Sequence, residues 1–386
     1  MSIAFARLGV VAPAKPIRKK VADDSQVVWQ LNLDQVEAQS GRVLKQIRLP
    51  VREAGNSTHW FGPEHVLYSK LRPYLNKVVI PEEEGIATTE LVPLLPDSDL
   101  LDRRYLAHYL RSEHFVSWIS SQVAGAKMPR VSMRVFWEHE IPLPSILDQR
   151  RIGITLDRAE SIRRKRQQAI VIADEFLRSM FLKMFGDPVT NSHVLKKRGV
   201  ATFCRLVRGS SPRPKGDPQF YGGPVPRLMV QDLTRDGFYV TPTIDSLTYE
   251  GAKKSRPVEA GTVVMAVSGN VGLAAILEID ACVHDGFVAF TSLDGQVILP
   301  EYLLYVMTLL KVTHKNREAG AIFKNLTTTQ IKDMEIPIPP IPQQVEFSKI
   351  VAQFSSLRQI LVQSAEDSDL LLRSIGLKAF SLKPSL

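Results

Sequence analysis

Cysteine is nearly absent from this chain, which has 386 residues and only two cysteines, Cys204 and Cys282. They lie far apart and form no CxxC pair, so we expect neither a disulfide framework nor a cysteine zinc site. No apolar run approaches the roughly 20 residues that cross a membrane, and the N-terminus is too short and proline-broken for a signal peptide. These absences predict a cytoplasmic protein with no membrane partner.

The sequence also lacks the common motifs of catalysis. It contains no GxxxxGK[ST] phosphate loop, no GxGxxG after a predicted strand and no HExxH helix. It has no Asn-Pro-Pro-Tyr or Asp-Pro-Pro-Tyr run, the type of motif found in the catalytic loop of amino-methyltransferases. The eight histidines show no ligand spacing. We therefore expect no catalytic residue and no metal site.

Positive charge is in excess. The chain has 49 Lys and Arg against 40 Asp and Glu, a net charge of +9 and a pI near 9.4. A basic balance favours a binding protein with a polyanionic partner over an enzyme that acts on acidic substrates. The length allows two or three domains.

The sequence predicts a long helix from Gln149 to Phe185, free of proline and followed by Gly186 as a stop signal. At 1.5 Å per residue this helix is roughly 50 Å long, which is typical of a spacer. Its apolar residues recur at steps of mostly three and four, which predicts one apolar seam. The seam consists of Ile152, Leu156, Ala159, Ile162, Ile170, Ala173, Leu177, Met180 and Met184.

This stretch occurs a second time without a gap. Gln149 aligns with Gln344 and Phe185 with Phe380, after the similar segments EIPLPSILDQ and EIPIPPIPQQ. The second apolar seam is Phe347, Val351, Phe354, Leu357, Leu361, Ala365, Leu372, Ile375 and Ala379. Matching apolar stripes are best buried against each other, so we expect two paired antiparallel helices. Two unrelated amphipathic helices would not explain the shared register.

A mixed unit of strands and helices is predicted before each long helix. Short apolar runs bounded by turn residues predict strands within 27–33, 42–49, 65–80 and 85–96 in the first unit, and within 202–208, 226–233, 261–269, 272–279 and 281–293 in the second. One helix is predicted in each unit, at 102–122 and at 300–316. The fold class is therefore α+β with an approximate two-fold internal repeat. The predicted segments are 1–139, 140–187, 188–334 and 335–386.

Basic, hydroxyl and aromatic residues gather in a few turn-rich segments, and such residues suit contacts to phosphates and base edges. A solvated surface is the competing reading of each residue taken singly. The candidates are Lys70, Arg72, Tyr74 and Lys77 in one loop, Lys127, Arg130 and Ser132 before the first long helix, Lys324, Asn325, Thr327 and Thr328 before the second, and Ser210, Ser211, Arg213 and Lys215 in GSSPRPK. The basic run 163–166 could be a solvated helix face, or could face DNA or an acidic partner.

These segments together resemble the specificity (S) subunits of type I restriction-modification systems. The resemblance rests on the order and duplication of GSSPRP with YGGPVPRLMVQDL, SGNVGLAAIL with ACVHDGFVAF, SKLRPYLNKVVI with GIATTELVPL, and IPLPSILDQ with IPIPPIPQQ. It adds Ser268 and Asn270 of the SGN segment to the candidate contacts. The first unit departs from the family by lacking a GxTP-type opening, which leaves its first strand and its contact loop undefined.

The resemblance implies a function without chemistry in this chain. Segments 1–139 and 188–334 would be target recognition domains that each read half of a split DNA site. Segments 140–187 and 335–386 would be spacers that fix the gap and dock two methyltransferase (M) subunits, joined by nuclease-translocase (R) subunits. S-adenosylmethionine and ATP with magnesium would then bind to these partners. The alternative is a coiled-coil adaptor or RNA- or protein-binding scaffold without DNA sequence preference.

Overall fold

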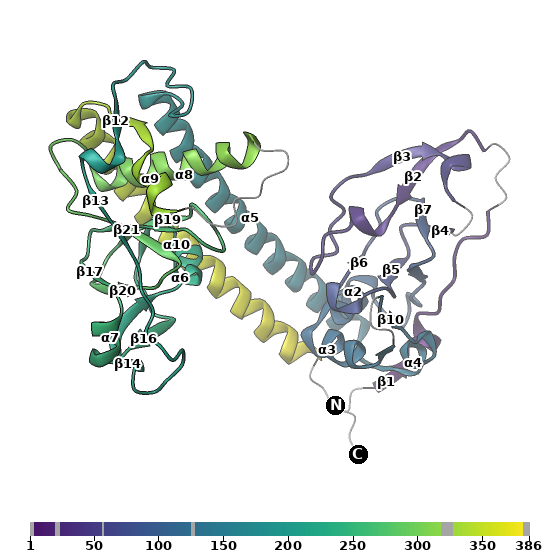
Figure 1. The fold of residues 1–386 in the computed structure, drawn as a ribbon. Coiled ribbons are helices and arrows are strands. Elements are labelled where there is room, and N and C mark those ends of the chain that lie inside the picture. Colours follow the sequence, from purple (N-terminus) through teal and green to yellow (C-terminus); the bar gives the residue numbers. More distant parts are fainter. Residues whose placement is uncertain (1–3, 20–23, 56–57, 125–127, 318–326, 381–386) are drawn as a thin grey trace. The chain divides into compact units, whose positions relative to one another are not determined.

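The structure, a computed structural model, describes residues 4–19, 24–55, 58–124, 128–317 and 327–380. It divides into two compact units, Met1–Lys165 with Ala365–Leu386, and Arg166–Ser364 (Figure 1). The long helices α5 (Ile146–Phe185) and α10 (Ile341–Phe380) each contribute to both units. The four segments predicted from the sequence describe the repeat rather than these units, and they stay a prediction.

In the first unit, a four-stranded sheet has the order β3-β2-β7-β4 and a three-stranded sheet the order β6-β5-β8, while β1 pairs with β11 and β9 with β10. The strands are β1 (Ala4–Arg7), β2 (Val27–Leu31), β3 (Ile47–Pro50), β4 (Thr58–Phe61), β5 (Val66–Ser69), β6 (Val78–Val79), β7 (Gly85–Thr88), β8 (Leu91–Leu94), β9 (Val123–Ala124), β10 (Arg130–Val131) and β11 (Glu140–Leu143). The helices are α1 (Leu8–Val11), α2 (Arg103–Arg111), α3 (Glu113–Ser121) and α4 (Met133–Glu138), with 3₁₀ turns η1 (Leu33–Gln35), η2 (Val51–Glu53) and η3 (Pro73–Leu75).

In the second unit, a five-stranded sheet has the order β13-β21-β18-β19-β15 and a four-stranded sheet the order β16-β14-β20-β17, while β12 pairs with β22. The strands are β12 (Lys197–Gly199), β13 (Arg205–Arg208), β14 (Tyr221–Leu228), β15 (Tyr239–Val240), β16 (Asp245–Leu247), β17 (Pro257–Val258), β18 (Val263–Ala266), β19 (Ala274–Leu277), β20 (Ala281–Val283), β21 (Phe287–Thr291) and β22 (Glu335–Pro337). The helices are α6 (Val230–Asp236), α7 (Tyr249–Lys254), α8 (Pro300–Arg317) and α9 (Thr328–Lys332), with the 3₁₀ turn η4 (Val200–Thr202).

The predicted repeat is confirmed by the strand pairing. Strand β5 pairs with β6 and β8 in the first unit, as β18 pairs with β19 and β21 in the second. The strand just before each long helix, β11 or β22, pairs antiparallel with the first strand of its unit, β1 or β12. The α+β class is therefore correct, and each unit holds its helix start against its own first strand.

Two predicted elements were wrong in their extent. The helix predicted at 102–122 is two helices, because Ser112 has an extended backbone and its Oγ accepts a hydrogen bond from Phe115 N (3.3 Å), which starts α3. The strand predicted at 226–233 ends at Leu228, because Asp232 Oδ2 accepts a hydrogen bond from Met229 N (2.9 Å) and caps α6. A local side-chain bond decides the backbone conformation in both places.

The long helices pair antiparallel, as the sequence predicted. In the first unit Arg163 Nη1 lies 3.6 Å from Asp369 Oδ1, and in the second unit Arg358 Nε lies 3.2 Å from Asp174 Oδ1. The offset of 195 residues that separates Arg163 from Arg358 also separates Asp174 from Asp369. The same ion pair therefore occurs once in each unit, at equivalent positions of the repeat.

The predicted apolar seam is only partly buried. Leu156, Leu177 and Val351 are buried, but Ile162 and its counterpart Leu357 are 49% and 45% exposed. Phe181 is fully buried although the seam did not include it. A period of three to four residues identifies a stripe, whereas the partner helix decides which residues of that stripe are covered. None of the helices within the described ranges is both long and apolar enough to span a membrane.

Buried glutamines fix the start of each long helix. Gln149 is fully buried, its Nε2 donates to Leu100 O and Pro144 O (2.9 Å each), and its Oε1 accepts from Asp102 N (2.9 Å). In the second unit, Gln344 is equally buried and makes the same three bonds, to Val297 O (3.0 Å), Pro339 O (2.8 Å) and Leu299 N (2.9 Å). These glutamines join α5 to the segment before α2, and α10 to the start of α8.

Candidate nucleic-acid interface

Backbone pairing brings two of the predicted contact segments of the first unit together. Leu71 forms an isolated antiparallel bridge with Arg130. Arg72 N donates to Pro129 O (2.8 Å), and Val131 N donates to Lys70 O (2.9 Å). The loop after β5 and the strand β10 therefore form one surface, which the sequence presented as two separate stretches.

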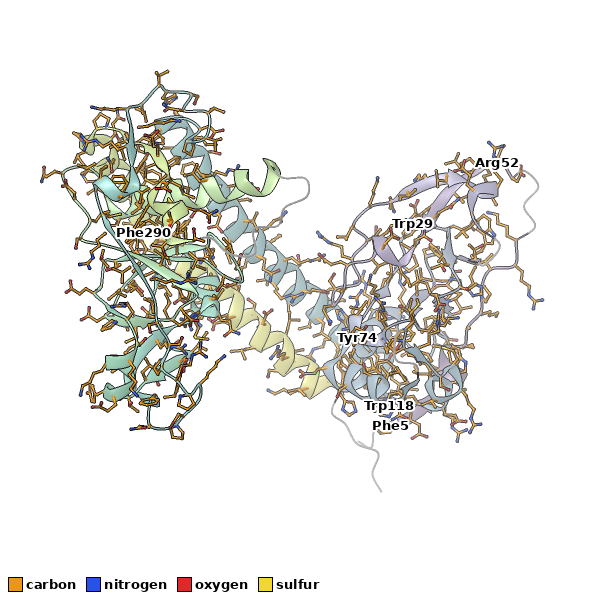
Figure 2. All side chains as sticks on the ribbon, in the orientation of Figure 1. Phe5, Trp29, Arg52, Tyr74, Trp118 and Phe290 are labelled. Carbon is orange, nitrogen blue, oxygen red and sulfur yellow. The ribbon has the colours of Figure 1, made fainter. Side chains whose placement is uncertain are left out.

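The side chains on this surface differ in how accessible they are to a ligand. Arg72 is exposed and has a left-handed backbone (φ 51°) that turns the chain into η3, and Tyr74 is 48% exposed (Figure 2). Lys70 is half-buried, and Lys77 is half-buried with its Nζ donating to Leu33 O (2.6 Å). A ligand can reach Arg72 and Tyr74 directly, whereas Lys77 must first give up its carbonyl partner.

Arg130 is held by a carboxylate that sequence reasoning did not single out. Its Nε and Nη2 both donate to Glu90 Oε1, at 3.1 and 3.0 Å, and the guanidinium remains about half exposed. A two-point contact fixes the plane of a guanidinium, so it presents its remaining donors in a set direction. Glu90 lies between β7 and β8, about 40 residues before Arg130, so no local pattern indicated this pairing.

In the second unit, Ser211 contacts the turn between β20 and β21, whereas Ser210 donates through its N to Val283 O (3.0 Å) and through its Oγ to Lys254 O (3.2 Å). Ser211 Oγ donates to Asp285 Oδ1 (2.5 Å), and this bond is the main reason that the pKa of Asp285 lies below its ordinary value. Arg213 is mostly exposed, with Nη2 3.9 Å from Asp285 Oδ2. Ser268 lies at the same turn, since a Cβ placed on Gly286 would come within 2.7 Å of Ser268 Oγ.

A buried arginine that no sequence pattern indicated stabilises this turn. Arg227 is 5% exposed, forms an ion pair with Asp245 and lies over the ring of Tyr221 at 5.3 Å. Its Nη2 donates to Ser211 Oγ (3.0 Å), so Arg227 positions the hydroxyl that binds Asp285. Burial lowers the pKa of the neighbouring His284, which therefore stays neutral near pH 7.

The remaining candidates fall into three groups. Thr327 caps α9 in a capping box with Gln330, and Ser132 occupies the same place before α4 without a side-chain cap. Lys215 and Asn270 are exposed in loops, and Thr328 is half-buried at the start of α9. Lys127, Lys324 and Asn325 lie outside the described residues. The structure does not test DNA contact by any of these residues, so each stays a prediction.

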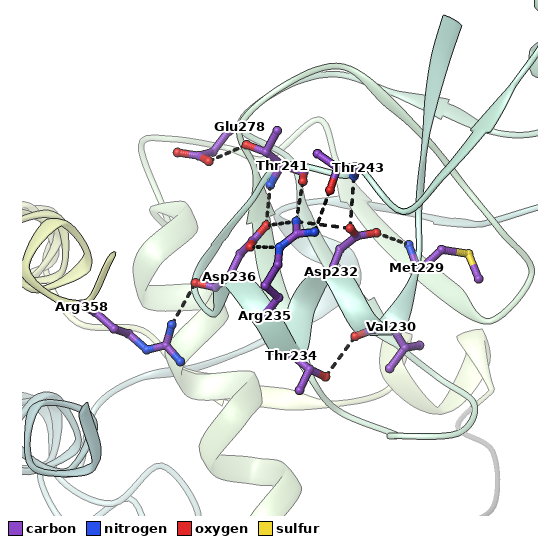
Figure 3. A network of polar contacts seen from close by, with 10 residues as sticks. All are labelled: Met229, Val230, Asp232, Thr234, Arg235, Asp236, Thr241, Thr243, Glu278 and Arg358. Atoms are coloured by element: carbon purple, nitrogen blue, oxygen red, sulfur yellow. Dashed lines mark hydrogen bonds and ion pairs between the residues drawn. The ribbon is translucent and has the colours of Figure 1, made fainter. Parts of the chain in front are cut away.

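A polar network joins α6, the segment after β15 and α10 in the second unit (Figure 3). Asp232 is fully buried and accepts from Thr243 N (3.1 Å), while Arg235 donates to Asp236 and to Thr241 O (2.9 Å). Arg358 of α10 donates to Asp236 O (3.1 Å). Because these groups are satisfied by one another, their role is to fasten α6 to β15 and α10.

The site has the chemistry of a binding surface. No cluster of three or more His, Cys, Asp or Glu able to hold a metal occurs in the part of the chain that the structure describes. The first unit presents Arg130 with Tyr74 on one surface, and the second presents Arg213 with Ser211; on each surface these groups can contact phosphates and base edges.

Comparison with known proteins gives one consistent family. The family model described as "Type I restriction modification DNA specificity domain" matches residues 64–171 and 222–366. The EcoDI specificity subunit of Escherichia coli is 24% identical over 139 residues, which cover 35% of this chain and 31% of that subunit. A putative type I restriction enzyme specificity subunit of Haemophilus influenzae is 19% identical over 370 residues, covering 89% of this chain and 92% of the relative.

Solved structures share the fold. The S subunit of a type I system from M. genitalium aligns over 98% of this chain and 96% of its own, with a TM-score of 0.62 and 14% identity. A chain from a study of complex assembly in the type I R-M system aligns over 98% and 97%, with a TM-score of 0.55 and 18% identity. The family model matches more than half of the chain, and the duplicated fold agrees with it, so this chain belongs to the family of type I restriction-modification specificity subunits.

Proposed function

We propose that each unit of this chain reads one half of a bipartite DNA site, with α5 and α10 setting the gap between the halves. The observation that carries the proposal is the duplication. The same strand pairing, the same buried glutamine at the start of the long helix and the same interhelical ion pair occur in both units. The predicted contact side chains differ between the copies, with Arg130 beside Glu90 in one and Arg213 beside Asp285 in the other. One scaffold with two reading surfaces suits an asymmetric split site.

The helices also offer surface for partner chains. Outward-facing apolar residues on α5 and α10 are Ile154, Ile162, Val171, Ile172, Phe176, Leu357, Ile360, Leu370, Leu371 and Leu377, all more than 40% exposed. Apolar side chains gathered on a helix surface mark protein interfaces. We propose that two methyltransferase subunits dock there and that nuclease-translocase subunits join the cytoplasmic complex. S-adenosylmethionine and ATP with magnesium would bind to those partners.

The decisive experiment assigns each unit to its own half of the site. Adenine methylation is mapped genome-wide in cells with and without the gene, and then with Arg130→Ala or Arg213→Ala in its place. Loss of one good contact costs about 1–3 kcal/mol, or roughly 5- to 150-fold in discrimination. We expect Arg130→Ala to relax only one half of the methylated motif and Arg213→Ala only the other.

The control is Arg198→Ala, which removes an exposed arginine on β12 outside both contact groups. We expect it to leave the motif unchanged. Methylation that is the same with and without the gene would contradict the proposal. Duplex binding by the assembled complex that shows no sequence preference would instead favour the adaptor.

A further inference from the structure

The turn that enters β8 and the turn that enters β21 occupy equivalent places in the two units. In the first unit Lys70 N donates to Glu90 O (3.0 Å), and in the second unit Val267 N donates to Gly286 O (2.8 Å). Each donor directly follows the strand, β5 or β18, that pairs with the strand that the turn enters. The two turns are therefore the same element of the repeat.

Both turns carry a carboxylate beside an arginine, but the residues are not equivalent. Gly286 is the counterpart of Glu90, and a Cβ on Gly286 would lie 2.5 Å from the ring of the histidine two residues earlier, so the carboxylate of the second unit is Asp285. The arginine is Arg130 of β10 in the first unit and Arg213, between β13 and β14, in the second. Duplication of a scaffold does not by itself explain why the same pair recurs from different segments.

Stability does not explain the recurring pair either. The side chains of Arg130 and Glu90 are 48% and 22% exposed, and those of Arg213 and Asp285 are 71% and 56% exposed. Ion pairs this open to solvent contribute little to the free energy of unfolding. Each pair also has no net charge, so it adds little attraction to the phosphates of DNA. The pair is better explained by the hydrogen-bonding groups that it presents to a base edge.

In the first unit the pair keeps free donors and a free acceptor. Arg130 Nε and Nη2 donate to Glu90 Oε1, at 3.1 and 3.0 Å, whereas Arg130 Nη1 has no acceptor among the described residues. Glu90 Oε2 accepts from the guanidinium only at 3.4 Å. Donors on Nη1 and Nη2 and an acceptor on Oε2 therefore remain for a ligand.

In the second unit the carboxylate is oriented from within the unit. Arg208 Nε donates to Asp285 O (3.2 Å), which holds the backbone of the turn. Arg227 Nη2 donates to Ser211 Oγ (3.0 Å), and that hydroxyl donates to Asp285 Oδ1 (2.5 Å). Asp285 Oδ2 lies 3.9 Å from Arg213 Nη2, which is too long for a hydrogen bond. Oδ2 and the exposed guanidinium are therefore both available to a ligand.

An arginine next to a carboxylate matches the major-groove edge of one kind of base pair. Guanine presents two acceptors there, N7 and O6, and its cytosine partner presents the N4 amino group as a donor. A guanidinium can donate to both guanine acceptors, while a carboxylate accepts from cytosine N4. An A·T pair presents an acceptor, a donor, a second acceptor and a methyl group, so the two adjacent donors of the guanidinium are not matched.

We propose that each unit reads one G·C base pair with its arginine and carboxylate together. Arg130 with Glu90 reads a G·C pair in one half of the DNA site, and Arg213 with Asp285 reads a G·C pair in the other half. In each case the arginine contacts guanine and the carboxylate contacts the cytosine of the same base pair. This inference rests on the proposed function, since it requires that both units read DNA, and it names the base pair that they read.

Genome-wide mapping of adenine methylation tests whether the two partners of a pair read the same base pair. Asp285→Asn removes the charge and leaves one acceptor fewer, and Arg213→Ala removes the donors. Both variants are expected to relax the same G·C pair, in one half of the motif, by about 5- to 150-fold. Glu90→Gln and Arg130→Ala are expected to relax one G·C pair in the other half. The matched control is Glu259→Gln, at an exposed carboxylate of the second unit before β18, which should leave the motif unchanged.

Duplex binding by the assembled complex separates base reading from mere positioning of the arginine. N4-methylcytosine at the mapped pair replaces the amino hydrogen that faces the major groove, and 7-deazaguanine removes N7. N4-methylcytosine should weaken wild-type binding at least about fivefold but should add little to the loss in Asp285→Asn. In the same way, 7-deazaguanine should weaken binding by the wild type but add little to the loss in Arg213→Ala.

Three results would overturn the inference while a split motif that depends on the gene leaves the proposed function standing. The first is an A·T pair at the relaxed position, and the second is relaxation of different base pairs by the arginine and carboxylate variants. The third is an equal effect of N4-methylcytosine on the wild type and on Asp285→Asn, because the carboxylate would then only position the arginine. Methylation that does not depend on the gene would overturn both the inference and the proposed function.

Discussion

Replacing Gln149 by alanine is expected to destabilise the first unit strongly, because this buried side chain satisfies three backbone groups at the start of α5. Each lost bond removes about 1 kcal/mol, and each buried backbone group left without a partner costs about 1–3 kcal/mol. Water entering the gap recovers part of that cost. We therefore expect a loss of roughly 3–5 kcal/mol in the free energy of unfolding.

Urea denaturation followed by circular dichroism measures this loss. With an m-value of about 2 kcal/mol/M, the midpoint of the affected transition should fall by about 1.5–2.5 M. Gln344→Ala should cause a fall of similar size, since Gln344 makes the equivalent bonds in the second unit. The matched control is Gln168→Ala, an exposed position on the same helix α5, which should change stability by less than about 0.5 kcal/mol.

The reasoning fails if Gln149→Ala shifts the midpoint no more than Gln168→Ala does. Gln149→Glu provides a second check, because it keeps the acceptor for Asp102 N but loses both donated bonds and buries a carboxylate. It should be at least as damaging as alanine at pH 7 and should recover as that carboxylate becomes protonated at lower pH.

Three further predictions follow from the packing and charges. Phe181→Ala should cost about 3–5 kcal/mol in urea unfolding, since it empties a fully buried ring site, and a loss below 1 kcal/mol would contradict the packing. Glu90→Gln should free Arg130, so duplex binding by the complex should become less sequence-selective, measured as the ratio of Kd for specific and random duplexes; an unchanged ratio would show that Glu90 does not position Arg130. Burial lowers the pKa of His139 to about 4 from an ordinary 6.5, so its contribution to stability is present above pH 6.5 and is lost as pH falls toward 4. His139→Phe should flatten that part of the stability profile between pH 7 and 4.5, and an equally steep profile would refute the assignment.

The duplication and the two long helices can be predicted from the amino-acid sequence alone, because both depend on local periodicity and on a register that holds over the whole helix. The sequence also placed Gln149 and Gln344 at equivalent positions, although not their three bonds. The family resemblance was visible in the order of loose motifs, and the family match and shared fold bear it out.

Which side chains contact one another depends on the three-dimensional packing. Segments far apart in the sequence pack against each other, and this packing determines three features. It pairs Arg130 with Glu90, it places Arg227 against Ser211, and it leaves Ile162 exposed. The local sequence pattern indicates which face of a helix or strand is apolar. Which residues that face covers depends on the element that packs against it.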